Sequence, residues 1–84
     1  MIVEVEMLAF GKGEIRPVDV PEDQITNILE DDLEMIFRYG QNDFQNLPFP
    51  SVSAGDIIHY KNQRHLVAGV GFKQMGEDEY KNYL

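Results

Sequence analysis

The 84-residue sequence contains no cysteine. Disulfides, zinc–thiolate sites, iron–sulfur clusters and thiol nucleophiles are therefore excluded. Small secreted domains usually depend on disulfides, so their absence favours a cytoplasmic protein. Long hydrophobic runs are also missing, since no stretch approaches the roughly 20 apolar residues that span a bilayer. The opening residues MIVEVE lack the basic start of a signal peptide. We therefore expect a cytoplasmic protein without a membrane segment.

Basic residues are few, because seven Lys and Arg stand against 15 Asp and Glu and give a net charge of −8. Phosphate backbones and anionic membranes repel such a chain, so we expect no direct binding to nucleic acid or to membranes. Two interpretations of the acidic surface remain. Either it only prevents self-association, or it docks on a basic partner, such as a nucleic-acid-binding protein whose groove it blocks.

The length of the chain and its hydrophobic fraction of 43% indicate one small domain over residues 1–84. A chain of this size buries only about 60–65% of its unfolded surface, so we expect a small free energy of unfolding. Burial of further surface in a partner would increase it. This favours a complex with another protein and also allows a homo-oligomer.

Two segments at the start of the chain are typical of strands. Residues 2–10 begin with strict alternation of apolar and charged side chains, which indicates a half-buried strand. Gly11 and Gly13 mark a turn, and residues 13–20 resume an extended pattern. Pro17 removes one backbone donor from this second segment, which predicts a short strand or one at an edge of the sheet.

Residues 21–39 are predicted to form an amphipathic helix, because Pro21 suits the first helical position and apolar residues recur at spacings of three and four. Residues 57–60 and 64–72 are apolar runs around a polar turn, which predicts a hairpin. Residues 77–84 are expected to form a short terminal helix or to fray. The predicted fold class is α+β, with a small, mostly antiparallel four-stranded sheet and the helix packed on one face, in the order β-β-α-β-β. The apolar stripe of the helix consists of Ile25, Ile28, Leu29, Leu33, Ile36 and Phe37.

The hairpin carries the only two histidines of the chain, His59 and His65. A three-residue turn over 61–63 would place His59 opposite His65, whereas a two-residue turn over 62–63 would place Tyr60 opposite His65. Only the first register brings the imidazoles together, and Asp56 or the C-terminal acidic residues would then have to supply a third metal ligand. A small metal-dependent enzyme is therefore one functional alternative. The other interpretation is two ordinary hairpin side chains.

Other catalytic motifs are missing. GKG at 11–13 lacks the spacing of a P-loop, and GVGF at 69–72 lacks the third glycine of a dinucleotide-binding fingerprint. Ser51, Ser53 and Asp56 are predicted to bond backbone groups of their own loop. We therefore expect a non-enzymatic protein without catalytic residues, cofactor or metal.

Acidic residues cluster in the predicted helix at Glu30, Asp31, Asp32 and Glu34. They resemble a calcium site only in composition, because an EF-hand loop requires a different spacing. We expect them to form the solvated face of the helix, and a partner-docking surface is the functional alternative. The predicted partner-binding residues are Glu30, Asp31 and Glu34, together with Phe44 and Phe49 of the loop over 41–50.

Four segments follow one another in the second half of the chain: LEMIF at 33–37, QND at 41–43, SVSAGDII at 51–58 and GF at 71–72. In this order they resemble the YodL-like proteins, short accessory products of phages, plasmids and integrative elements. The resemblance covers residues 33–75 and supplies no catalytic residues. It implies a non-enzymatic accessory protein that binds a host or phage protein in the bacterial cytoplasm. The alternative is an acidic inhibitor that blocks the nucleic-acid-binding surface of a host defence or transcription protein.

Overall fold

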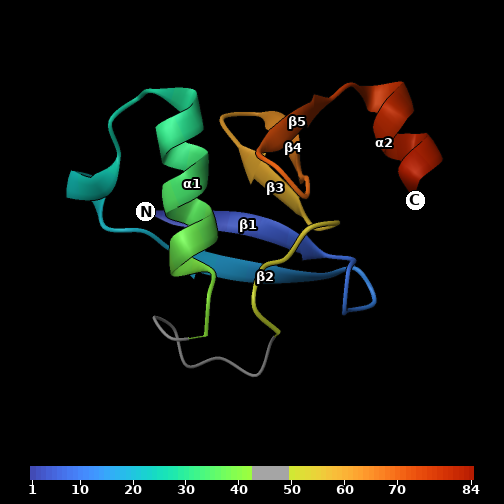
Figure 1. The fold of residues 1–84 in the computed structure, drawn as a ribbon, viewed down its shortest axis with the longest axis horizontal. Helices are drawn as coiled ribbons and strands as arrows, with labels where there is room; N and C mark the ends of the chain where they lie inside the picture. The colour runs from blue at the N-terminus through green and yellow to red at the C-terminus, as the bar shows by residue number, and fades with distance from the viewer. Residues whose placement is uncertain (43–49) are drawn as a thin grey trace.

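The computed structural model describes residues 1–42 and 50–84, which form one antiparallel sheet between two helices (Figure 1). The strands lie in the order β2-β1-β3-β4-β5. The predicted α+β class is confirmed, whereas the predicted count of four strands is wrong by one. The elements are β1 (Ile2–Met7), β2 (Glu14–Asp19), the 3-10 helix η1 (Glu22–Gln24), α1 (Leu29–Tyr39), β3 (Ile57–Tyr60), β4 (Gln63–Val67), β5 (Phe72–Met75) and α2 (Glu77–Tyr83).

The first two strands follow the sequence pattern closely. β1 pairs with β2 in a register that places Val3 opposite Val18 and Val5 opposite Arg16. Gly13 adopts a φ of 86° in the connecting turn, a conformation that a side chain would strain. β2 lies at an edge of the sheet, so the expectation from Pro17 is confirmed.

The predicted helix over 21–39 is too long at its start, because α1 begins only at Leu29. The preceding chain forms η1 and then an irregular turn in which Asn27 has a φ of 66°. The carboxylate of Asp32 stabilises this turn by accepting hydrogen bonds from the backbone N–H of Thr26 at 2.8 Å and of Asn27 at 3.1 Å. These bonds compete with continuation of the helix toward Pro21.

The hairpin of β3 and β4 has a register that differs from both predictions. Its two-residue turn consists of Lys61 and Asn62, with φ values of 51° and 62°. Tyr60 therefore pairs with Gln63, and Ile58 pairs with His65. Two consecutive positive φ values are typical of the turn type that matches strand twist.

The predicted strand over 64–72 is divided into β4 and β5. The chain reverses between Val67 and Phe72, and the N–H of Ala68 donates to the carbonyl of Gly71 at 3.0 Å. Gly71 has a φ of 74° there, which favours glycine. The reversal creates the fifth strand. β5 leads to the helix α2, so of the two predicted states of residues 77–84, a short helix or frayed chain, the structure has the helix.

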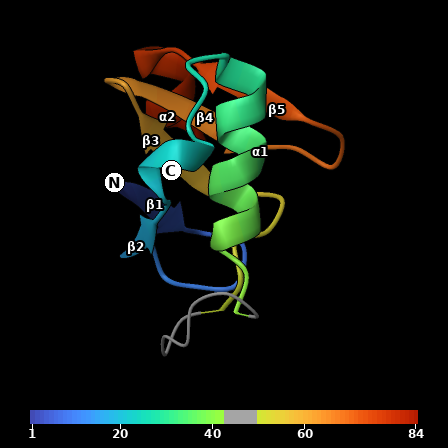
Figure 2. The same cartoon turned by 90° about the vertical axis from the view of Figure 1, so that its left-hand side faces the viewer.

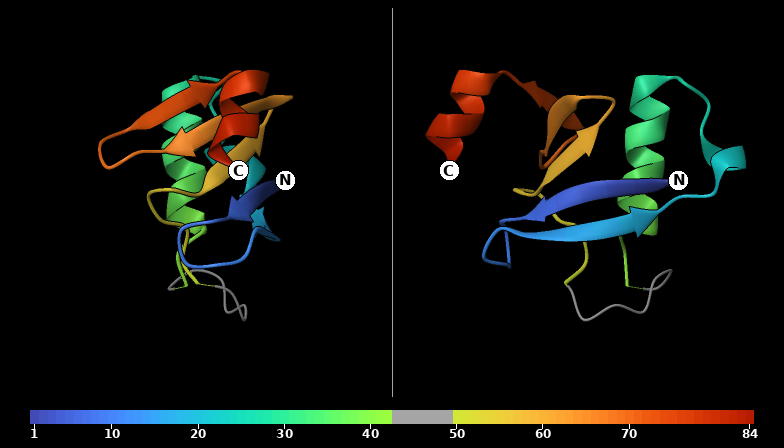
Figure 3. Two further views of the ribbon diagram at one scale, coloured as in Figure 1. Left: turned by 90° about the vertical axis from the view of Figure 1, so that its right-hand side faces the viewer. Right: turned by 180° about the vertical axis from the view of Figure 1, so that it is seen from behind.

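The hydrophobic core lies between α1 and one face of the sheet (Figure 2). Side chains alternate across a strand, so Val5 faces the core while its neighbours Glu4 and Glu6 face the opposite side. α2 contacts that opposite side, at the far end of the sheet from α1 (Figure 3). The main buried residues of the core are Val3, Val5, Met7, Val18, Val20, Leu33, Ile36, Val52, Ile58, Tyr60 and Val67.

Candidate functional site

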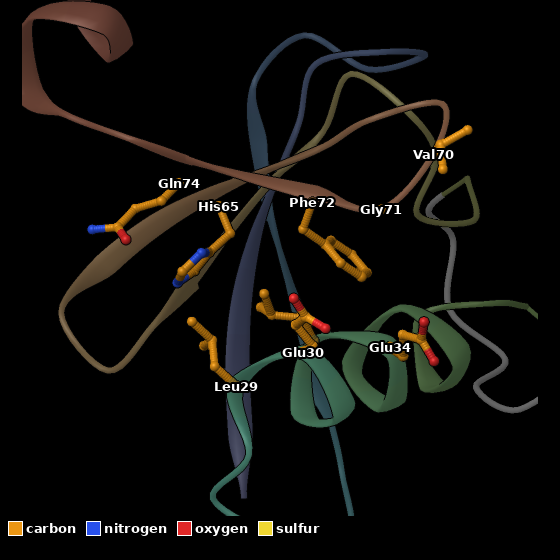
Figure 4. Close-up of a pocket in the computed structure, with 9 residues that line it drawn as sticks. Leu29, Glu30, Glu34, His65, Val70, Gly71, Phe72 and Gln74 are labelled. Carbon is orange, nitrogen blue, oxygen red and sulfur yellow. The ribbon is translucent and has the colours of Figure 1, made fainter.

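A groove runs between α1 and the β4–β5 hairpin. It consists of two adjoining pockets of about 360 and 330 Å³ that share Glu34, Gly71 and Phe72. We call it the acidic groove and define it by Leu29, Glu30, Leu33, Glu34, His65 and Phe72. Figure 4 shows His65 and Phe72 pointing from the sheet toward α1, which presents Leu29, Glu30 and Glu34.

Helical spacing explains the composition of the α1 wall. Leu29 and Leu33 are four residues apart and form an apolar ridge, and Glu30 and Glu34 form a parallel acidic ridge one position further along. Leu33 is buried in the core, whereas Leu29 remains 40% exposed. The groove therefore has an apolar floor and an acidic rim.

The two rim carboxylates are not neutralised within the described part of the chain. Neither Glu30 nor Glu34 forms an ion pair there, while Lys73 and Lys81 pair with acidic residues of α2. Like charges four residues apart on a helix repel each other. A cation bound between these carboxylates would relieve that repulsion.

His65 forms part of the opposite wall. The side chain is only 1% exposed, and its Nε2 has no hydrogen-bond partner among residues 1–42 and 50–84. Burial lowers the pKa of His65 below 6.5, so the imidazole is neutral at pH 7. A buried polar atom without a partner costs about 1–3 kcal/mol. A ligand that supplies the missing hydrogen bond would recover part of this free energy.

A second polar cluster lies on the opposite face of the sheet. The buried carboxylate of Glu6 contacts Nε2 of His59 at 2.5 Å and accepts a hydrogen bond from the Tyr80 hydroxyl at 2.5 Å. The guanidinium of Arg64 stacks 4.1 Å from the centre of the Tyr80 ring. The hydrogen bond to Glu6, and secondarily burial, raises the pKa of Tyr80. Because these groups bond one another, the cluster serves to hold α2 on the sheet.

The structure separates the predicted partner-binding residues. Glu30 and Glu34 line the acidic groove, whereas Asp31 is exposed and lies outside its lining. Phe44 and Phe49 lie outside the described residues. Asp32, predicted on the solvated face of the helix, is instead fully buried and accepts a hydrogen bond from the Tyr60 hydroxyl at 2.9 Å. The placement predicted for Asp32 is wrong because its carboxylate stabilises the turn before α1.

The residues of the hypothetical metal site do not converge. His59 and His65 lie on opposite faces of the hairpin, because their positions in the register differ by one step. Asp56 is fully buried and accepts three hydrogen bonds of 2.8 Å, from the N–H groups of Leu8, Ala9 and Ser53. Its predicted role of bonding backbone groups is confirmed. Over the described ranges, no group of three His, Asp or Glu side chains is arranged to hold a metal ion.

Sequence reasoning found the acidic ridge but missed His65 as part of the same site. Its position depends on the turn at Lys61 and Asn62, and the left-handed tolerance of Asn62 was the available signal.

Comparison of the chain with protein-family models, curated proteins and solved structures gives no match. None of the helices in residues 1–42 and 50–84 has the length and apolar character needed to cross a bilayer.

Proposed function

We propose that this chain is a non-enzymatic accessory protein of the bacterial cytoplasm that binds a basic segment of another protein in the acidic groove. The observation that supports this most is the combination of an apolar floor with the unneutralised carboxylates of Glu30 and Glu34. Apolar contact supplies affinity, and opposite charge supplies specificity and a faster encounter. The association with a phage or other mobile element rests on the resemblance of residues 33–75.

The groove is formed by elements that fix its shape. Leu33 and Ile36 anchor α1 in the core, and Val67 anchors the end of β4 beside it. A pre-formed groove binds without a large ordering cost, since its walls do not have to be assembled on contact. This rigidity favours recognition of a short segment of the partner.

An affinity pull-down from bacterial lysate tests the proposal if three baits are compared. They are the wild-type protein, the double variant Glu30→Gln/Glu34→Gln, and the control Asp31→Asn, which changes an exposed carboxylate of the same helix outside the groove. We expect a protein that the wild type and the control capture but the double variant loses. Equal capture by all three baits, or no specific capture by any of them, would contradict the proposal.

An acidic inhibitor of a nucleic-acid-binding protein is the second candidate. It is favoured by the exposed carboxylates of two successive elements, Glu22 and Asp23 in η1 and Glu30, Asp31 and Glu34 in α1. Such an inhibitor would act over this wider surface, so both Asp31→Asn and the groove double variant should weaken capture. Its complex should also dissociate as salt rises, because exposed charges are screened over about 10 Å at 0.1 M salt. Capture that persists at moderate salt would count against this candidate.

A further inference from the structure

The acidic groove contains a buried polar atom without a hydrogen-bond partner, Nε2 of His65, which the charge of its rim does not explain. Building on the proposed function, we propose that the partner protein inserts an arginine side chain here. Its guanidinium donates one hydrogen bond to Nε2 of His65 and lies against the carboxylates of Glu30 and Glu34. The inference therefore specifies which residue of the basic segment the groove recognises.

The chemistry of His65 selects a donor. A neutral imidazole protonated on Nδ1 offers Nε2 as an acceptor, and burial keeps this histidine neutral by lowering its pKa. Leu29, which is 40% exposed, faces the ring across the pocket (Figure 4). The proposal requires Leu29 to rotate so that a donor that enters from the groove can reach Nε2.

The arrangement of acceptors favours arginine over lysine. His65 lies on the sheet wall, and the two carboxylates lie on the helix wall. A guanidinium presents five N–H donors in a flat, rigid fork and can reach acceptors on both walls at once. The ammonium group of lysine is more strongly hydrated and acts as a point charge. It would therefore lose more hydration free energy than a guanidinium on entering the groove beside the buried His65.

The apolar residues of the groove fit the rest of an arginine side chain. Its three-carbon stem can pack on Leu29 and Leu33, as long basic side chains do on apolar surfaces. Phe72 also lines this pocket, and an aromatic ring is a favourable neighbour for a guanidinium. Each part of the side chain thus has a matching part of the groove.

Nuclear magnetic resonance titration of the ¹⁵N-labelled protein tests this. The probes are the peptide acetyl-Leu-Arg-Leu-amide and two matched peptides in which lysine or uncharged citrulline replaces arginine. We expect the arginine peptide to shift backbone signals of Glu34 and Phe72 and to move the ¹⁵N signal of His65 Nε2. Its affinity should exceed that of the lysine peptide by roughly tenfold, since charge-assisted forked hydrogen bonds are the stronger ones. The citrulline peptide should bind at least as weakly as the lysine peptide.

Variants separate this inference from the proposed function. Glu34→Gln should weaken binding of both cationic peptides, and Asp31→Asn should leave both unchanged. His65→Leu should remove the preference for arginine, whereas His65→Gln keeps an acceptor oxygen and should restore part of it. A thermal melt of each variant identifies loss of folding.

Equal binding of the arginine and lysine peptides in the groove, or an unmoved Nε2 signal, would overturn the inference and leave the proposed function standing. If neither cationic peptide shifts any signal of the groove, the inference and the proposed function both fail.

Discussion

Replacement of Asp56 by alanine should remove much of the stability of this protein. The Oδ1 atom of this buried carboxylate accepts hydrogen bonds from the N–H groups of Leu8 and Ala9, just after β1, and Oδ2 accepts the N–H of Ser53. Asp56 also lies close enough to the buried guanidinium of Arg16 to favour its charged form. One side chain therefore joins the end of β1, the loop before β3 and a buried cation.

The magnitude follows from these contacts. Hydrogen bonds to a charged group contribute about 1.5–3 kcal/mol each. Water can reach these partly buried amides in the variant, and the three contributions are not additive, so we expect a total loss of about 3–5 kcal/mol. The free energy of unfolding of an 84-residue domain is about 4–13 kcal/mol. Asp56→Ala should therefore be partly unfolded if the wild type lies at the low end of this range, and folded but clearly less stable if it lies at the high end.

Urea denaturation followed by circular dichroism measures this loss. Asp56→Asn keeps one acceptor oxygen for Leu8 and Ala9 and should lose about half as much stability as alanine. Asp31→Ala is the matched control, because this exposed carboxylate in the first turn of α1 should contribute no more than about 1 kcal/mol through the helix dipole. The slope of free energy against urea should stay constant if the folded and unfolded states keep their exposed surfaces. A loss below about 1 kcal/mol for Asp56→Ala would refute the reasoning.

Three further predictions concern groups whose pKa values the fold changes, and a fourth concerns the attachment of α2. Burial opposes ionisation of Asp32, but its hydrogen bonds outweigh burial and lower its pKa below 3.8. The stabilising contribution of Asp32 is therefore present above pH 3.8 and is lost as the pH falls through the lower pKa of the folded state. Asp32→Asn should remove this part of the acid denaturation, which is measured as the urea midpoint at each pH. Burial and then Asp32 raise the pKa of Tyr60 from 10.0 to about 12. The contribution of Tyr60 to stability is present below pH 10 and is lost as the pH rises through about 12. Tyr60→Phe should therefore reduce the loss of stability at alkaline pH. An ultraviolet titration of the wild type in which every tyrosine ionises near pH 10 would contradict this prediction. Burial lowers the pKa of His65 below 6.5, so its contribution is present above pH 6.5 and is lost at lower pH; an imidazole signal that titrates at 6.5 or above would be the opposing result. Tyr80→Phe removes the hydrogen bond to Glu6 and should speed amide hydrogen exchange in α2. The global free energy of unfolding should change little, because all residues of α2 are described and none of them is buried. Unchanged exchange in α2 would show that the tyrosine does not hold the helix.

The features of the fold that follow from local pattern could be predicted from the sequence. Alternation along β1, the edge position of β2 and the apolar stripe of α1 each depend on residues close together in the chain. The start of α1 could not be predicted in this way. It depends on Asp32, whose carboxylate both stabilises the turn at Thr26 and Asn27 and bonds the distant Tyr60.

Hairpin register was the second failure, and it left open which face of the sheet His65 occupies. Lysine has no strong preference for positive φ, so the sequence did not mark Lys61 as a turn residue. A shift of one residue moves every side chain to the other face of the strand. The acidic ridge of Glu30 and Glu34 was visible from helical spacing. The face on which His65 lies stayed open, because the two predicted registers place His65 on opposite faces of the hairpin.

The strand order of the sheet has a consequence for folding kinetics. β1 and β2 form one local hairpin, and β3, β4 and β5 form a local meander. The two halves are joined into one sheet by the pairing of residues 4–6 with residues 57–59. Local hairpins form in about 1–10 μs, whereas contacts between distant parts of a chain require closure of a long loop and slow folding. The β1–β3 pairing is therefore the step expected to limit the folding rate, and Asp56, which bonds backbone groups just beyond β1, belongs to that step.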